Sequence, residues 1–352
     1  MPLSDFTLAL SVLNFVGSVL SSIGSGFIIV CYLVLPIRRH FRHVLILNLA
    51  IADFINATNN SASGSLILIR RENLSRGPAC IFNGFVTQIS VQATDTAILA
   101  ITITTVYTIT RISHSHAIQT EWSNRAIVLT CIAIWILPAI TSFLALGMHW
   151  YGPVSGNWCW LVEKPSFLRY VLTHGWRYLF MLIEICLSLY LYIFLRRHFR
   201  ALRVPIISSV PADSIQSPAF SPMSFTNSNA EREQKRDLSE TYDTPMDSTL
   251  SSHNAIVLSA SRTLPAMTSQ MESPRYKAVH RILLLNAYPF FYIILWIPGL
   301  ANRIVEASGH SSKITQILQA STQFVGLANA ITYGWNERIA RELRRKYFRR
   351  RN

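Results

Sequence analysis

Seven long apolar stretches divide this sequence, and they limit its possible folds more than any other feature does. The first runs from Phe6 to Ile37 without an acidic or basic side chain. A helix of about 20 apolar residues can cross the hydrocarbon core of a bilayer, which is roughly 30 Å thick. The predicted helical spans are 6–37, 44–69, 81–110, 126–147, 178–195, 282–301 and 314–335. We therefore expect an all-α membrane protein, a bundle of seven transmembrane helices.

The chain is strongly basic, but its charge density is low. Lys and Arg outnumber Asp and Glu by 32 to 18, which gives a formal net charge of +14. Charged residues make up only 14% of the chain, whereas soluble domains average about 25%. This balance argues against a soluble enzyme, a disordered chain and a nucleic-acid-binding protein. We expect no enzymatic activity, no cofactor, no metal and no nucleic-acid partner.

The distribution of Lys and Arg among the loops predicts the orientation in the membrane. With the N-terminus outside, 24 of the 32 Lys and Arg residues fall on the cytoplasmic side, as the positive-inside rule requires. The loop 70–80 is the exception, because it is basic but external in this topology. We expect a multi-pass protein of the plasma membrane with a cytoplasmic C-terminus. Residues 1–195 then hold helices one to five, and residues 278–336 hold helices six and seven.

Two cytoplasmic segments have distinctive compositions. Residues 196–277 form one long loop, which from Val204 on is rich in Ser, Thr and Pro. We expect this loop to be largely disordered, and its Ser-Pro and Thr-Pro pairs are minimal sites for kinases. The tail 337–352 has eight basic and two acidic residues. It is expected to form an amphipathic helix on the anionic inner leaflet, with a disordered basic tail as the alternative.

On the predicted external side, two cysteines and one glycosylation motif stand out. Cys80 and Cys159 are the two cysteines outside the predicted spans, and the external compartment is oxidising. We predict a Cys80–Cys159 disulfide that ties the top of helix three to the loop after helix four; two free thiols are the alternative. Asn73 begins an Asn-Leu-Ser sequon, so close to span two that its use is left open.

Three acidic side chains lie inside predicted spans. A charge at mid-bilayer costs about 2.5–3.5 kcal/mol on insertion scales, so Asp53, Asp95 and Glu184 should face the interior of the bundle. Asp53 belongs to a polar stripe on one face of span two. It would hold an ion or a water cluster that couples two states, or simply form interhelical hydrogen bonds. Asp95 and Glu184 would contact a ligand or pack as neutral acids.

Span six contains Pro289 and Pro298. Each proline frees a backbone carbonyl and permits a kink in a helix. Two such positions predict that span six is a moving lever, and static kinks satisfied by neighbouring helices are the alternative.

Three classes of seven-helix protein compete. A retinal pump needs a lysine in the middle of helix seven, and span 314–335 contains none. A transporter often shows internal repeats and broken half-helices, and no repeat is present here. A signalling receptor fits the layout best. The segment before span one has about five residues, so the helices and short loops must recognise the ligand. A seven-helix transporter or channel remains the alternative.

Several motifs carry a resemblance to known receptors. Leu47–Asp53 (LNLAIAD) resembles the second-helix signature of rhodopsin-type G-protein-coupled receptors. Further motifs are similar to the fungal glucose-receptor and cAMP-receptor-like group: Arg42–Gly64, Gly156–Trp160 (GNWCW), Thr173–Arg177 (THGWR), Ile297–Arg303 (IPGLANR) and Gly326–Glu337. The resemblance implies a receptor for a small extracellular ligand, either a nutrient such as glucose or a cAMP-like molecule. It also implies activation of a heterotrimeric G protein that feeds cAMP signalling.

Two departures from the rhodopsin-type pattern affect the switch. Helix three ends in Tyr107–Arg111 with no acidic residue before the arginine, so Arg111 is either a switch or an interfacial cation. In helix seven, Asn329–Tyr333 (NAITY) resembles the NPxxY motif with Ala in place of Pro. The resemblance implies that Asn329 and Tyr333 form an inner switch.

We assign candidate residues to three regions on these grounds. The ligand pocket should lie in the outer half of the bundle and include Gln88, Gln92, Asp95, Trp176, Arg177, Glu184, Trp296 and Gln319. The switch should include Asp53, Pro289, Pro298, Asn329 and Tyr333. The G-protein face should include Arg38, Arg42, Arg111, Arg196, Arg200, Lys277, Arg281 and Asn336. Arg177 and Arg303 would suit an anionic ligand and the amides and acids a neutral sugar; the sequence does not decide between them.

Overall fold

The structure is a computed structural model that describes residues 4–35, 41–72, 74–114, 122–154, 158–162, 167–203, 286–308, 310 and 312–336. The described helices up to His198 and those from residue 286 onward belong to one compact unit. Several predictions fall outside the described residues. These are the loop beyond residue 203, the tail 337–352, the sequon at Asn73, and Arg38, Lys277 and Arg281.

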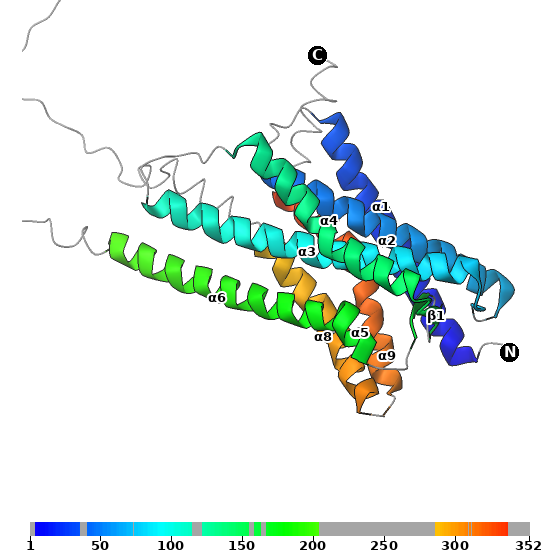
Figure 1. Cartoon of the computed structure of the whole chain (residues 1–352). Helices are drawn as coiled ribbons and strands as arrows, with labels where there is room; N and C mark the ends of the chain where they lie inside the picture. Colours follow the sequence, from blue (N-terminus) through cyan, green and yellow to red (C-terminus); the bar gives the residue numbers. More distant parts are fainter. Residues whose placement is uncertain are drawn as a thin grey trace, which may run out of the picture. The chain divides into compact units, whose positions relative to one another are not determined.

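Long helices dominate the described part of the chain (Figure 1). They are α1 (Asp5–Val34), α2 (Phe41–Arg70), α3 (Pro78–His114), α4 (Asn124–Gly147), α6 (Gly175–Arg203) and α8 (Ala287–Ala307). A short helix α5 (Phe167–Arg169) and a π turn η1 (Tyr170–His174) lead directly into α6. The last part consists of α9 (Lys313–Gln319), the 3₁₀ segment η4 (Ala320–Phe324) and α10 (Val325–Asn336). Two strands, β1 (Tyr151–Pro153) and β2 (Cys159–Leu161), lie between α4 and α5.

Five helical stretches among the described residues are long and apolar enough to cross a membrane. They are Asp5–Val34, Pro78–Arg111, Asn124–Gly147, Phe167–Arg197 and Ala287–Glu306. Predicted spans 44–69 and 314–335 are not among them. The first coincides with α2 but carries the polar stripe, and the second is broken into α9, η4 and α10. Polar residues lower the hydropathy of a helix, yet they are tolerated where they face other helices rather than lipid.

The structure corrects three details of the sequence prediction. Span seven is not one continuous helix, because η4 interrupts it. The fifth helical stretch begins at Phe167, well before the predicted Tyr178, because α5 and η1 continue into α6. Pro289 lies in the first turn of α8 and does not kink its interior, since backbone N–H groups there have no partner within the helix to lose. Pro298 does lie inside α8.

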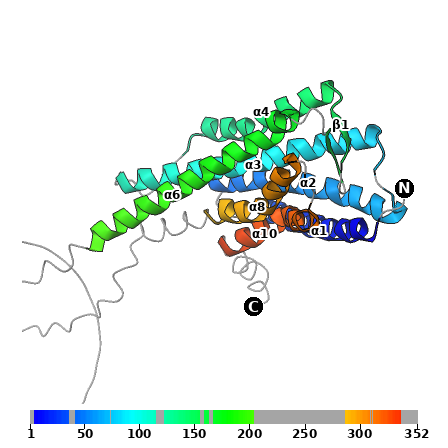
Figure 2. The same ribbon diagram turned by 90° about the horizontal axis from the view of Figure 1, so that it is seen from below.

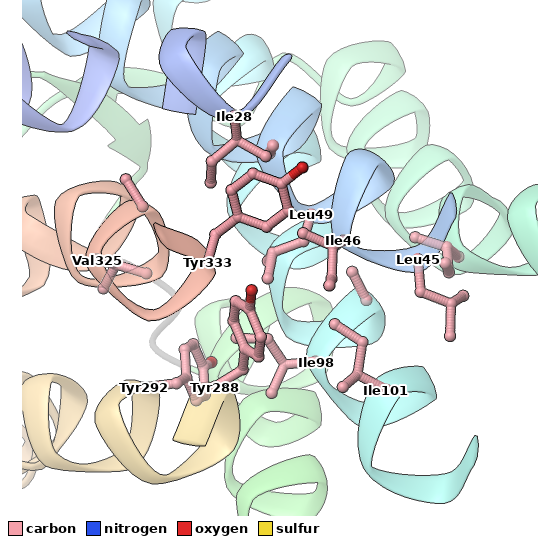
Figure 3. Packing of buried hydrophobic residues seen from close by; sticks show 14 of the residues in the cluster. Ile28, Leu45, Ile46, Leu49, Ile98, Ile101, Tyr288, Tyr292, Val325 and Tyr333 are labelled. Carbon is pink, nitrogen blue, oxygen red and sulfur yellow. The ribbon is translucent and has the colours of Figure 1, made fainter. Parts of the chain in front are cut away.

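The first four helices pack in chain order, and α10 returns to the beginning of the chain. α1 contacts α2, η4 and α10, while α2 contacts α3, and α8 contacts α9 and α10. One buried apolar cluster joins these helices (Figure 3). In it the ring of Tyr333 lies beside Ile28 and Leu49, and Tyr288 and Tyr292 of α8 lie near Ile98. The cluster therefore fixes α8 and α10 against α1, α2 and α3.

The 3₁₀ segment η4 is stabilised from α1. The Ser21 hydroxyl donates to the carbonyl oxygen of Gln323 at 2.5 Å and accepts from the backbone N–H of Leu327 at 3.2 Å. A Cβ at Gly326 would lie only 3.0 Å from the Ser21 carbonyl oxygen, so this glycine permits the close approach. A break inside a membrane helix leaves backbone groups that neighbouring side chains must satisfy. Ser21 supplies both bonds at this break.

A disulfide anchors the β hairpin to α3. Cys80 and Cys159 are bonded, with their Cα atoms 5.4 Å apart, which confirms the predicted pair. The strands are antiparallel, with Gly152 opposite Trp160. Figures 1 and 2 both place β1 at the same end of the described bundle as the N-terminus. We call this the disulfide end.

Candidate functional site

A cavity lies among α2, α3, β2, η1, α6, α8, α9 and η4. It contains about 590 Å³ of space, part of which is open to solvent. Three tryptophans, two arginines, one histidine and several amide and hydroxyl side chains contribute to its wall. The lining residues are Asn56, Asn60, Thr87, Val91, Trp158, Trp160, His174, Arg177, Trp296, Gly299, Leu300, Arg303, Gln319, Thr322 and Gln323. Aromatic faces combined with a few polar side chains are typical of a pocket for a small molecule.

Arg177 links the cavity to a buried acid. Its Nε donates to Oδ2 of Asp95 at 2.9 Å, and both side chains are at most 3% exposed. The Tyr292 hydroxyl donates to the other carboxylate oxygen of Asp95. The Arg177 guanidinium carbon lies 3.7 Å from the ring centroid of Trp296, within the range of a cation–π contact. Residues from α3, α6 and α8 thus form one buried network under the cavity.

A second network lies between α8 and α9. The Asn302 amide donates to Oε1 of Gln319 at 2.6 Å, and its own oxygen accepts from the Thr315 hydroxyl at 2.6 Å. Arg303 is paired with Glu306, Nη1 to Oε2 at 2.6 Å. Gln319 and Arg303 line the cavity. This network holds the two polar lining residues in place and connects α8 with the helical segment after it.

Some of the predicted ligand residues line the cavity, and others do not. Arg177, Trp296 and Gln319 line the cavity, and Asp95 lies behind Arg177 without lining it. Trp176 is 36% exposed and also does not line the cavity. Glu184 is fully buried, and its carboxyl oxygens have no hydrogen-bond partner among the described residues.

Gln88 and Gln92 hold the loop region together instead of lining the cavity. The Tyr151 hydroxyl donates to Oε1 of Gln88 at 2.8 Å, and burial raises the pKa of that hydroxyl above its usual range. Gln92 donates to the Leu172 carbonyl at 2.6 Å and accepts from the Thr141 hydroxyl at 2.5 Å. The two glutamines therefore tie β1, α4 and η1 to α3.

Several cavity residues were not in the sequence-based set. His174, Trp158 and Trp160 lie in or next to the motifs THGWR and GNWCW. Asn60, Thr322 and Gln323 also line the cavity. The predicted disulfide could have indicated the two tryptophans, because it brings the residues on either side of Cys159 close to the start of α3. The motif THGWR was the available signal for His174, which lies at the end of a π turn.

The predicted switch residues occupy a separate buried site. Asp53 accepts hydrogen bonds from the Thr94 hydroxyl at 2.8 Å and from the Asn329 amide at 2.7 Å. Asp53 and Asn329 are 5% and 1% exposed. Tyr333 is buried one turn further along α10. The site joins α2, α3 and α10 on the side of η4 away from α9.

Three residues of the predicted G-protein face have described side chains. Arg42 is partly buried, Arg196 is exposed, and Arg111 is exposed and donates to the Tyr107 hydroxyl at 2.8 Å. Arg200 and Asn336 lie in α6 and α10, with side chains outside the described set. Arg42 lies at the start of α2 and Arg111 near the end of α3, so both lie far along their helices from the disulfide at the start of α3, and Arg196 and Asn336 lie near the C-terminal ends of α6 and α10.

A bundle of apolar helices around a polar cavity, with a disulfide-anchored hairpin, defines a multi-pass membrane protein with a rhodopsin-like fold. Squid rhodopsin superposes on 99% of this chain and 87% of its own with a TM-score of 0.64, at 11% sequence identity. At that identity the likeness concerns the fold alone.

The sequence comparisons define the family. Residues 7–202 match the Git3 model, described as a G protein-coupled glucose receptor regulating Gpa2. The chain belongs to the Git3 family of G-protein-coupled receptors, which are not enzymes. Two curated relatives from Arthrobotrys oligospora are the ascaroside receptors GPR2 and GPR3. GPR2 is 26% identical over 91% of this chain and 86% of its own, and GPR3 is 27% identical over 92% and 84%.

Proposed function

We propose that this protein is a plasma-membrane receptor that binds a small polar ligand from outside and activates a heterotrimeric G protein that feeds cAMP signalling. The N-terminus and the disulfide end face outward in this proposal, and the C-terminus is cytoplasmic. The observation that carries the proposal is the cavity, which combines tryptophan faces with amide, hydroxyl and arginine side chains. Aromatic surface with a few placed polar groups is typical of small-molecule sites.

The family and the relatives support a sugar-bearing ligand. The family description names glucose, and the two relatives are named as ascaroside receptors. Amide side chains such as Asn60 and Gln323 can both donate to and accept from hydroxyl groups. We therefore place hexoses and ascarosides first among the candidates, with cyclic nucleotides as the next class.

The route from the cavity to the switch runs through η4. Gln323 lines the cavity, and its Oε1 accepts from Asn60 at 3.2 Å and from Ser18 at 2.9 Å. Asn329, which binds Asp53, follows η4 in the next helix. A ligand that contacts Gln319 or Gln323 better in one arrangement of η4 shifts the equilibrium by that difference in affinity. A change in η4 would move Asn329 relative to Asp53 and so change the position of the C-terminal end of α10.

The basic helix ends opposite the disulfide end form the proposed G-protein face. Arg42, Arg111, Arg196, Arg200 and Asn336 belong to it, together with Arg38, Lys277 and Arg281 outside the described residues. The loop 204–277 is proposed as a kinase substrate, and the basic tail as a contact to the anionic inner leaflet.

The test uses the full-length receptor in lipid nanodiscs with a purified G-protein heterotrimer. Nucleotide exchange is measured with hexoses, ascarosides, amino acids and cyclic nucleotides. One class should accelerate exchange in the wild type and fail in Gly299→Leu, since a Cβ at Gly299 already lies 3.1 Å from Thr322 and a longer side chain fills the cavity. Gly77→Leu is the matched control, because nothing lies within 4 Å of a Cβ there.

Two results would count against the proposal. An equal response of Gly299→Leu and wild type would place the ligand elsewhere. Ligand-independent ion flux through the receptor in liposomes, without nucleotide exchange, would favour a channel or transporter. Antibody access to an N-terminal tag on intact cells tests the orientation, which predicts labelling without permeabilisation.

A further inference from the structure

Buried hydrogen-bond donors without partners gather at the cavity. His174 has no partner on either ring nitrogen, and neither Nη2 of Arg177 nor the indole N–H of Trp160 or Trp296 has one among the described residues. All four side chains line the cavity. His174, Arg177 and Trp160 are 5%, 3% and 6% exposed. Buried polar groups are nearly always hydrogen-bonded, so several unpaired donors at one place need an explanation.

These donors share one chemical property. Arginine and indole N–H groups can only donate, and a neutral imidazole donates from one nitrogen. The complementary ligand group therefore accepts several hydrogen bonds and offers few or none. A carboxylate or a phosphate does this, whereas a sugar hydroxyl is both donor and acceptor.

The charges around the cavity are compatible with an anion. Arg177 and Arg303 line it, and among the described residues no Asp or Glu contributes to its lining. The acids that neutralise these arginines, Asp95 and Glu306, lie behind them. The two arginines thus line the cavity, and their partner carboxylates do not. An anion bound here contacts donors without a carboxylate directly opposite it.

Another part of the cavity has the opposite polarity. Oδ1 of Asn60 is buried and has no partner within the described part of the chain, while the Asn60 amide donates to Gln323 at 3.2 Å. An unpaired carbonyl oxygen calls for a donor such as a hydroxyl group. The lining therefore combines mostly donors on η1, α6, α8 and β2 with an acceptor on α2.

We propose that the ligand carries an anionic oxygen group, a carboxylate or a phosphate, which His174, Arg177, Trp160 and Trp296 bind, while Asn60 accepts from a hydroxyl of the same molecule. This inference rests on the proposed function, because it names the ligand class of the same cavity. It narrows the candidates of the proposed function to acids that also carry a hydroxyl group.

The test observes the indole N–H groups directly. The full-length receptor is labelled with ¹⁵N-tryptophan in nanodiscs, and the Trp160 and Trp296 signals are assigned with Trp160→Phe and Trp296→Phe. Acetate and glucuronate form the carboxylate arm, inorganic phosphate and glucose 6-phosphate the phosphate arm, and glucose and methyl glucuronate the neutral arm. We expect one anionic arm to shift both indole signals and the neutral arm to leave them in place. The responding arm identifies the anion.

Affinity measurements with the responding anion give a second readout. Trp160→Phe keeps the ring beside His174, where the centroids are 6.4 Å apart, but removes the N–H. It should weaken binding about tenfold, the usual effect of losing one hydrogen bond to a charged group. Trp176→Phe is the matched control, since Trp176 does not line the cavity, and its affinity should equal that of the wild type.

Defined outcomes overturn the inference. If neither anionic arm moves the Trp160 and Trp296 signals, or if glucose and methyl glucuronate move them equally, there is no anion subsite. Should nucleotide exchange still respond to a neutral hexose in that case, the receptor proposal survives without the subsite. Anion binding without any effect on nucleotide exchange would instead count against the receptor proposal alone.

Discussion

Arg177 and Asp95 form a buried ion pair across 82 residues of sequence, with Nε of the arginine 2.9 Å from Oδ2 of the aspartate. The pair joins α6 to α3, and Tyr292 adds a hydrogen bond from α8. Burial of one charge without its partner is strongly unfavourable. The pair and Tyr292 therefore hold α3, α6 and α8 together. The pair also leaves Nη2 of Arg177 without a partner among the described residues, on a side chain that lines the cavity.

Removal of Asp95 should destabilise the receptor. Asp95→Leu leaves the Arg177 charge buried and unpaired, with an expected loss of about 3–5 kcal/mol. The double variant Asp95→Leu with Arg177→Met should recover much of the loss, because it removes both charges. Thermal unfolding of the purified receptor in nanodiscs measures both effects. A single variant as stable as wild type would contradict the role given to this pair.

The Asp53–Asn329 bond should affect signalling more than folding. Asn329→Ala leaves one oxygen of Asp53 with one bond fewer, a change of about 1–3 kcal/mol that is divided between the two receptor states. We expect about a fivefold shift in the ligand concentration for half-maximal nucleotide exchange, since a difference of about 1 kcal/mol between the two states corresponds to that factor. Thr332→Val is the control, because its hydroxyl bonds within α10 at the Ala328 carbonyl. Equal dose–response curves for both variants would exclude the switch.

The break in the last helical stretch should depend on Ser21. Ser21→Ala removes the hydroxyl that bonds Gln323 and Leu327, at an expected cost of about 0.6 kcal/mol and at most about 1.7 kcal/mol. Ser25→Ala is the matched control, since that hydroxyl bonds the Ser21 carbonyl of its own helix at 2.7 Å. Chemical unfolding in mild detergent compares the two. The idea fails if Ser25→Ala is the more destabilising change.

Charge reversal at the proposed cytoplasmic face should abolish coupling. Arg196→Glu combined with Arg281→Glu replaces two cations expected to meet the G protein, while Arg196 is exposed and Arg281 lies outside the described residues. We expect no nucleotide exchange with unchanged surface expression. Arg70→Glu with Arg71→Glu, two exposed residues at the disulfide end, should leave exchange intact. Normal exchange by the first variant would remove this face from the coupling model.

Thiol labelling should distinguish the five cysteines. Cys80 and Cys159 are bonded, whereas Cys31, Cys131 and Cys186 are free. In denaturant without reductant, three thiols per chain should react, and two more should react after reduction. Peptide mass spectrometry assigns the sites. Labelling of Cys80 and Cys159 before reduction would disprove the bond.

The sequence alone was sufficient for features that depend on local composition or on compartment. Apolar length gave most of the helices, because crossing a bilayer requires a fixed number of apolar residues. The cysteines outside the spans gave the disulfide, since the oxidising side contained only that pair. The interruption at η4 was missed because Ser21, which bonds the backbone there, lies 302 residues before Gln323 in the chain.

The candidate site was also predicted only in part from the sequence. The sequence analysis assigned Arg177, Asp95, Trp296 and Gln319 to the ligand pocket. It gave Gln88 and Gln92 the same role, although these two bond α3 to the hairpin and η1. Which intramembrane polar groups bind each other and which face open space depends on helix rotation and packing, which no one-dimensional pattern contains. Composition therefore determined a basic, multi-pass membrane protein, and the motifs indicated a receptor. Only the tertiary structure decided that Arg177 binds Asp95 with Nε and leaves Nη2 for the cavity.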